Sequence, residues 1–191
     1  MNNIIIIKTE EHIDRLVTSL ISQKVVFIDT EFFYKNTYYP KLSTIQITCS
    51  LKKQYIIDAL ELDISQIEVF YKQVLCNSNI VKVMHSVDQD LKMFLHLFKM
   101  LPKNIFDTQI AYSMLFHENN IGYAKMCKLM LNKNIDKTLQ STDWSRRPLT
   151  NEMMKYAILD THYLDPIYRN MKFEIDGRNL NNNFSHYISN I

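Results

Sequence analysis

Glycine is nearly absent from this chain, because 191 residues include only Gly122 and Gly177. Two isolated glycines cannot supply G-x-G-x-x-G or the Walker pattern, so glycine-rich phosphate-binding loops are excluded. Cysteine is also scarce: Cys49, Cys76 and Cys127 lie far apart, and no C-x-x-C pair exists. We therefore expect no disulfide framework or zinc knuckle, and the cysteine usage fits a cytoplasmic protein.

Long apolar runs and a strong net charge are missing as well. No apolar stretch approaches the roughly 18–20 residues that span a bilayer, and we expect no membrane partner. The apolar run at residues 4–7 is too short for a signal peptide and is followed by Glu10 and Glu11. The formal net charge of +2 does not indicate nucleic acid, so any basic groove must be local.

The composition that remains is typical of one globular domain, with 47% hydrophobic and 22% charged residues. The apolar periodicity predicts an α/β domain with a mixed β-sheet flanked by helices. We assign the domain to residues 1–172 and a polar tail to residues 173–191. The predicted strands are 3–7, 25–32, 43–50, 54–58, 80–84 and 105–106. The predicted helices are 9–21, 65–75, 87–100, 108–116, 123–131 and 150–171, with Thr9 and Thr150 as N-caps.

Four acidic residues stand at positions that the predicted elements can bring together. Asp29 and Glu31 are two apart at the end of a strand, so their side chains project from one face. Asp90 opens a helix, and Tyr156 and Asp160 share a helix face four residues apart. Clustered carboxylates repel one another, whereas Mg²⁺ and Mn²⁺ prefer oxygen ligands and remove that cost. The pattern predicts a metal-dependent nuclease.

Phosphoryl chemistry suggests a role for each residue. One divalent cation would lie between Asp29, Glu31 and Asp160 and make a bound water nucleophilic. A second would be held by Asp29 and by Asp90, directly or through water, and would neutralise the leaving oxygen. Tyr156 has an ordinary phenol pKa of about 10 and would therefore orient the water at neutral pH.

Each acid alone also has a structural explanation. A lone D-x-E often ends a solvated strand, and Asp90 could be an acid favoured by the helix dipole. Asp88, two residues earlier, is the rival if the helix register differs. We treat Asp58 as a structural strand end and Asp107 as a helix cap. The site prediction rests on the joint occurrence of the acids.

The sequence around these acids resembles the ribonuclease D branch of the DEDD exonucleases, in the form with tyrosine in the last motif (DEDDy). The motifs span roughly residues 25–168, and their order and context are specific. They are F-I-D-T-E-F (27–32), Y-Y-P-K-L-S-T-I-Q (38–46), M-H-S-V-D-Q-D-L (84–91), F-D-T-Q (106–109), S-T-D-W-S-R-R-P-L (141–149) and Y-A-I-L-D (156–160).

The resemblance implies a ribonuclease-H-like fold and 3′→5′ hydrolysis that releases nucleoside 5′-monophosphates with two Mg²⁺ or Mn²⁺ ions. It also implies that the four acids are metal ligands and that Tyr156 positions the attacking water. Ribonuclease D proper has further helical nucleic-acid-binding domains, whereas this chain ends soon after its last predicted helix. We therefore expect short oligoribonucleotides more than tRNA precursors as substrates, and the sequence leaves a homo-oligomer open.

Residues within these motifs are expected to contact the substrate. The segment 136–148 carries cations and one aromatic ring, which could hold a strand end by phosphate contact and stacking. Trp144 could instead be anchored in the core, and His85 could be a satisfied structural histidine. The expected substrate-binding residues are Thr30, Phe32, Leu42, Gln46, His85, Lys137, Gln140 and Trp144; Arg146 and Arg147 are further cations of the segment.

An aromatic and basic cluster follows Glu31 and is made of Tyr34, Lys35, Tyr38, Tyr39 and Lys41. A single-stranded 3′ end could stack there, or the cluster could be an exposed turn with one or two core tyrosines.

The leading hypothesis is a 3′→5′ exoribonuclease that binds single-stranded 3′ ends, with RNA favoured over DNA. A DNA exonuclease of the proofreading or repair type would use the same ions. A non-catalytic nucleic-acid-binding module is the alternative from another class, and the complete set of acids argues against it.

Overall fold

One mixed six-stranded sheet forms the centre of the protein. The structure is a computed structural model that describes residues 4–50 and 53–181. The strand order is β1-β4-β3-β2-β5-β6, and β3 is antiparallel to both of its neighbours, whereas the other pairs are parallel. The strands are β1 (Ile4–Ile7), β2 (Val25–Phe33), β3 (Lys41–Ser50), β4 (Lys53–Asp58), β5 (Val81–Met84) and β6 (Ile105–Asp107). The expected α/β fold with a mixed sheet is confirmed.

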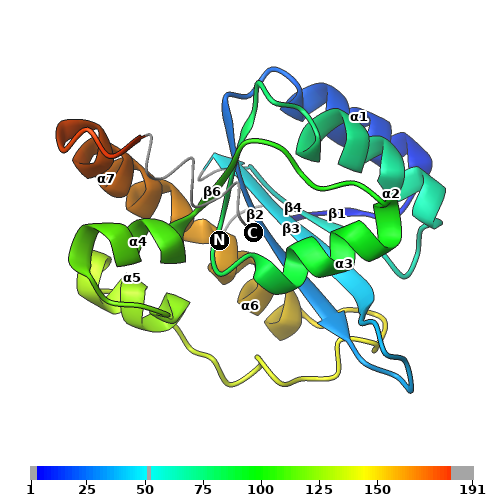
Figure 1. The fold of residues 1–191 in the computed structure, drawn as a ribbon. Helices are drawn as coiled ribbons and strands as arrows, with labels where there is room; N and C mark the ends of the chain where they lie inside the picture. Colours follow the sequence, from blue (N-terminus) through cyan, green and yellow to red (C-terminus); the bar gives the residue numbers. More distant parts are fainter. Residues whose placement is uncertain (1–3, 51–52, 182–191) are drawn as a thin grey trace.

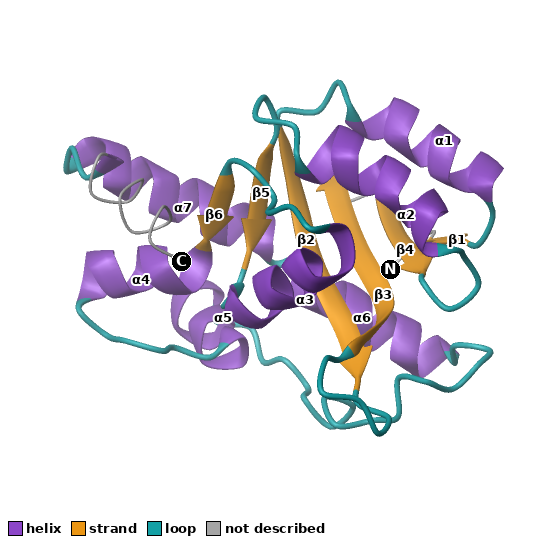
Figure 2. Ribbon diagram, turned by 45° about the vertical axis from the view of Figure 1, so that its right-hand side comes forward, coloured by secondary structure: helices purple, strands orange, loops and turns teal. Residues whose placement is uncertain are grey.

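Helices cover both faces of this sheet (Figures 1 and 2). The helices are α1 (Glu10–Leu20), α2 (Ile64–Phe70), the π-helical turn η1 (Tyr71–Leu75), α3 (Asp88–Phe98), α4 (Thr108–Phe116), α5 (Tyr123–Leu131), α6 (Asn151–His162) and α7 (Leu164–Gly177). One core cluster joins the sheet to α1, α2, η1 and α3, and two others join its opposite face to α4, α5, α6 and α7. The described part of the chain contains no helix long and apolar enough to cross a bilayer.

Strand β2 explains how the sheet positions the acids. Val26 and Ile28 pack in the cluster with α1 and α3, whereas Phe27 packs in a cluster with α4 and α7. Because side chains alternate along a strand, Asp29 and Glu31 follow Phe27 onto the face that α6 covers. The apolar run therefore fixes the strand in the core and the direction of both carboxylates.

The single helix predicted over 150–171 is wrong, because the structure has α6 and α7 with a break at Tyr163. Pro166 lies in the first turn of α7, where a missing N–H costs little, and it favours the start of a new helix there. The tail predicted from residue 173 begins inside α7, whose Ile175 is buried. Residues 182–191 lie outside the described residues.

Local capping follows the sequence. Thr9 and Thr150 accept backbone N–H bonds at the starts of α1 and α6, and Asp107 caps α4, as expected. The helix ends are unusual, because Lys99, His117 and Asn132 take up left-handed backbone conformations after α3, α4 and α5. Glycine is the usual residue there, and its scarcity leaves these positions to residues with a side chain.

Candidate active site

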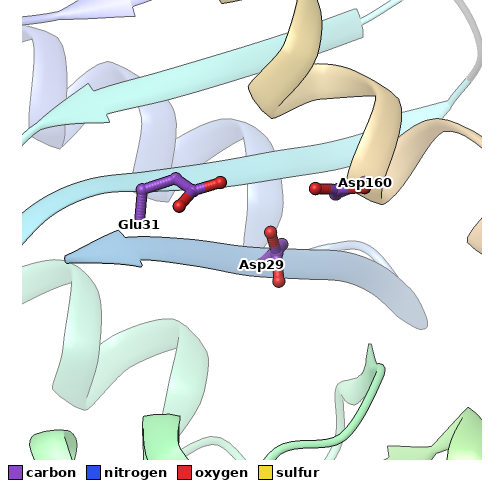
Figure 3. Close-up of side chains that lie close together, drawn as sticks. All are labelled: Asp29, Glu31 and Asp160. Carbon is purple, nitrogen blue, oxygen red and sulfur yellow. The ribbon is translucent and has the colours of Figure 1, made fainter. Parts of the chain in front are cut away.

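Three carboxylates converge between β2 and α6. Asp29, Glu31 and Asp160 each offer an oxygen, and these ligand atoms all lie within 4.8 Å of one another. Figure 3 shows the two strand residues and the helix residue pointing into a shared space. The donor set contains only oxygen, which fits a hard divalent cation such as Mg²⁺ or Mn²⁺.

The fourth acid, Asp90, comes from the first turn of α3 and approaches from the other side of β2. It is 8% exposed, and the Thr30 hydroxyl donates a hydrogen bond to its carboxylate. Asp90 is not one of the three carboxylates that lie within 4.8 Å, but it lines the same cavity and its charge raises the pKa of Asp29. Its rival Asp88 has a 60% exposed side chain that pairs with Lys92. The geometry therefore favours Asp90 over Asp88 as the acid of this site.

The electrostatics of the site are those of uncompensated negative charge. Burial, followed by the charges of Asp160, Glu31 and Asp90, raises the pKa of Asp29 well above its usual value. Burial and the neighbouring charge of Asp160 raise the pKa of Glu31 to about 8, and burial raises the pKa of Asp90 to about 7. Groups that resist ionisation to this extent need a cation before all of them can be charged together at neutral pH.

Lys137 supplies part of the positive charge that these acids need. Its Nζ lies 2.6 Å from Asp160 Oδ1 and 3.5 Å from the Tyr156 hydroxyl. The same ammonium lies 5.3 Å from the ring centre of Tyr123 and 5.2 Å from that of Tyr156. Its charge partly offsets the rise in the pKa values of Asp29, Glu31 and Asp160. The sequence indicated Lys137 as a substrate contact but gave no sign of this ion pair.

Tyr156 adjoins the acids one helical turn before Asp160. Burial, followed by the charges of Asp160, Glu31 and Asp29, raises its pKa above the ordinary phenol value. The hydroxyl is therefore protonated at neutral pH, and it forms a hydrogen bond with Asp160. This state is compatible with a group that orients a water and does not suit a ready base.

A cavity of about 620 Å³ opens beside these groups. Of the eight expected substrate-binding residues, five line it: Thr30, Phe32, His85, Lys137 and Gln140. The His85 Nδ1 lies 3.0 Å from Thr108 Oγ1, and burial lowers the histidine pKa to about 4, so the ring is neutral. His85 thus combines a structural hydrogen bond with a place on the cavity wall.

Three expected substrate contacts lie elsewhere. Gln46 is fully buried and faces Asp29 across the β2–β3 ladder, where it borders the acid and not the cavity. Trp144 is 2% exposed in a core cluster, with its ring centre 6.0 Å from that of Tyr156, so the structure favours the core-anchor alternative. Leu42 lines a different cavity.

Arg147, expected as a cation for substrate phosphate, is instead part of the framework. Its Nε lies 2.7 and 2.9 Å from the two carboxylate oxygens of Asp58, and a terminal nitrogen donates to the Ser43 carbonyl. A fully buried acid at a strand end requires such a partner. The apolar run that ends in Asp58 was the sequence signal that this acid could be buried and need a cationic partner. Arg146 remains exposed, with 78% of its side chain accessible.

Known proteins are similar to this chain in sequence and in fold. A sequence model of a 3′-5′ exonuclease family matches residues 4–176. Ribonuclease D of Nitrobacter hamburgensis is 32% identical over 173 residues, which cover 91% of this chain and 44% of that protein. The crystal structure of Escherichia coli RNase D has a TM-score of 0.83 at 31% identity and covers 92% of this chain and 46% of its own.

The catalytic core of RRP6 from Trypanosoma brucei gives a TM-score of 0.84 at 27% identity, over 95% of this chain and 48% of that one. This chain thus spans less than half the length of these relatives. The match nevertheless extends over nearly all of the described residues, including both β2 and α6. The chain therefore belongs to the 3′-5′ exonuclease family, in the branch that resembles ribonuclease D.

Proposed function

We propose that this protein is a metal-dependent 3′→5′ exoribonuclease that removes nucleoside 5′-monophosphates from single-stranded RNA. The observation that carries the proposal is the convergence of Asp29, Glu31 and Asp160 within 4.8 Å, next to a protonated Tyr156. The name ribonuclease D that its relatives carry supports RNA, and not DNA, as the substrate of this protein. Short oligoribonucleotides and longer RNA 3′ ends both remain substrates to be compared.

The residues present fit two divalent cations. Asp29, Glu31 and Asp160 would hold one, and Asp29 with Asp90 would hold the other, as Mg²⁺ or Mn²⁺. When bound, such ions lower the pKa of a water and stabilise charge on the attacking and leaving oxygens. Asp90 is fixed for this role because Thr30 holds its carboxylate.

The other side chains of the cavity orient the attacking water and hold the phosphate and the terminal nucleotide. Tyr156 stays protonated and can donate a hydrogen bond to the water or to a phosphate oxygen, which fixes the direction of attack. The Lys137 ammonium lies beside both Asp160 and Tyr156, where it balances negative charge brought by a phosphate. Phe32 and Gln140 form the walls against which the terminal nucleotide would lie.

Mutation of Asp160 tests the site. Asp160→Asn removes one charge from the three-acid set, so we expect a folded protein whose hydrolysis of RNA falls by several orders of magnitude. Asp14→Asn, an exposed acid on α1, is the matched control and should keep full activity. Retention of even a tenth of normal activity by Asp160→Asn would show that the site is assigned to the wrong residues.

The substrate is tested by a time course with 3′-tailed RNA, matched DNA and a dinucleotide, each with Mg²⁺ and with Mn²⁺. We expect mononucleotide release from RNA, faster than from DNA, and complete loss in excess EDTA. Equal or faster DNA digestion would favour a DNA exonuclease. No hydrolysis with any substrate or ion would favour a binding module.

A further inference from the structure

A second cavity, of about 580 Å³, lies at the side of the molecule where the β2–β3 hairpin meets the end of α3. We call it the hairpin groove, and define it by Tyr38, Tyr39, Lys41, Leu42, His96 and Leu97. It shares no lining residue with the cavity at the acids. Nothing in the site described above uses this groove.

The groove presents aromatic rings to solvent. Tyr39 stacks on His96, with ring centres 3.8 Å apart and an angle of 12° between the planes. Tyr38 meets Tyr39 edge to face at 5.0 Å, and Tyr38 is 89% exposed. Leucines form the wall behind these rings. Exposed rings over an apolar wall are a surface on which unpaired bases stack.

The exposed surface of α3 connects the groove to the acidic cavity. Asp88, Lys92 and His96 are four residues apart and therefore follow one stripe of the helix. Asp88 lines the acidic cavity and His96 lines the groove, about 12 Å further along the helix at about 1.5 Å per residue. Lys92 stands between them with a 71% exposed side chain.

Strand pairing gives a second connection between the two cavities. Phe32 of β2 is paired with Leu42 of β3. Phe32 lines the acidic cavity, whereas Leu42 lines the groove. Both views place α3 in front of these strands and α6 behind them (Figures 1 and 2). In the described sheet β5 pairs with β2 only over residues 25–27, and the acidic cavity beyond that point is lined both by Glu31 on the α6 side and by Asp90 on the α3 side. An RNA strand can therefore pass from the acids around this edge of β2 to the α3 side and reach the hairpin groove.

We propose that the hairpin groove binds a base of the same single-stranded RNA, upstream of the 3′ nucleotide that the acids hold. This inference rests on the proposed function and adds a second binding position to it. Tyr38 and the Tyr39–His96 pair stack on the base. Lys92, which now pairs with Asp88, and Lys41 at the groove are the cations for the intervening phosphates. A dinucleotide is too short to occupy both places.

Substrate length is the test, because the groove acts only on strands that reach it. Tyr38→Ala and His96→Ala are compared with unaltered protein on a dinucleotide and on a single strand of about eight nucleotides. We expect KM for the longer strand to rise about tenfold in each variant, the scale of one lost ring–base stack. The kcat for both substrates and KM for the dinucleotide should not change.

Controls separate stacking from other effects. Tyr38→Phe keeps the ring and should keep the KM of the unaltered protein. Phe173→Ala removes a 77% exposed ring from α7, far from the groove, and should leave KM and kcat unchanged for both substrates. Fluorescence anisotropy of the labelled longer strand, measured with Asp160→Asn as background, gives affinity without turnover and should show the same tenfold loss on Tyr38→Ala.

Three outcomes would overturn the inference. An equal rise in KM for both substrate lengths would mean that the rings contact the nucleotide held at the acids. An unchanged KM for both lengths would mean that the groove binds no nucleic acid. If no substrate were hydrolysed at all, the proposed function would fail. The anisotropy measurement would then still test whether the groove binds RNA, because an unchanged affinity in Tyr38→Ala would exclude that binding.

Discussion

At the scale of single residues, Tyr156 has the best-defined chemistry. Its phenol is held protonated by burial and by three nearby acids, and its hydroxyl lies within reach of both Lys137 and Asp160. A group in this state can position a water or a phosphate oxygen, and it leaves the binding of cations to the carboxylates. Loss of the hydroxyl should therefore affect the rate without affecting the metal.

Tyr156→Phe tests this separation. We expect kcat for RNA to fall by about 10²–10⁴-fold, the range typical of a positioned acid–base group, while Mn²⁺ affinity measured by calorimetry stays unchanged. Tyr168→Phe alters a tyrosine that packs on Phe27 and Phe106 and is the control. A loss of Mn²⁺ affinity in Tyr156→Phe would contradict the role given to the hydroxyl.

Sequence reasoning could place the acidic residues in two local groups, because the geometry of one strand or of one helix sets each group. The alternation of β2 puts Asp29 and Glu31 on one face, and one helical turn joins Tyr156 to Asp160. The place of Trp144 could not be settled in the same way. Whether that ring faces solvent or Tyr156 depends on how a long irregular segment folds back, and that is decided by contacts distant in sequence.

At the scale of elements, the irregular segment between α5 and α6 is the part whose anchoring is most specific. It carries Lys137 to the acids and is held to the sheet near its other end by Arg147. The Asp58 carboxylate in that pair is fully buried, and the next cation, Lys8, lies 3.9 Å away. Removal of one partner from a buried pair leaves an uncompensated charge.

Arg147→Met should therefore lower the free energy of unfolding by about 3 kcal/mol, measured by chemical denaturation. The neighbouring Arg146→Met is the matched control. Its side chain is 78% exposed, so the same substitution should change stability by no more than about 0.5 kcal/mol. Equal effects of the two substitutions would show that the Asp58 pair does not anchor the segment.

The elements themselves were largely predictable, and the exception has a local cause. The strands follow from apolar runs and alternation, and the N-caps from Thr9, Asp107 and Thr150. The division between α6 and α7 was missed because apolar periodicity continues through it. Pro166 was the available signal, but a proline near a helix start is recognised only once the break at Tyr163 is known.

At the scale of the whole molecule, the acids make stability depend on pH and on metal. Glu31 and Asp90 have folded-state pKa values of about 8 and about 7, above those of the unfolded chain. Between the two sets of values the folded protein binds more protons, so the free energy of unfolding falls as pH rises. Acidic pH therefore stabilises the metal-free protein through these groups.

We expect the melting temperature in EDTA to decrease from about pH 5 to about pH 8, and Mg²⁺ or Mn²⁺ to restore it most strongly at the upper end. Glu31→Gln removes one of these titrating groups and should flatten the decrease. The measurement is thermal unfolding across that range with and without metal. A melting temperature in EDTA that rises with pH, with a slope that Glu31→Gln leaves unchanged, would contradict the prediction.

The near absence of glycine has a consequence for engineering. Where α3, α4 and α5 finish, Lys99, His117 and Asn132 occupy backbone conformations that disfavour a β-carbon. Within the strands and helices that the structure describes, no residue has a left-handed backbone conformation. Substitutions that raise thermostability can therefore be sought at the junctions that end these helices, and none of these three residues lines the acidic cavity.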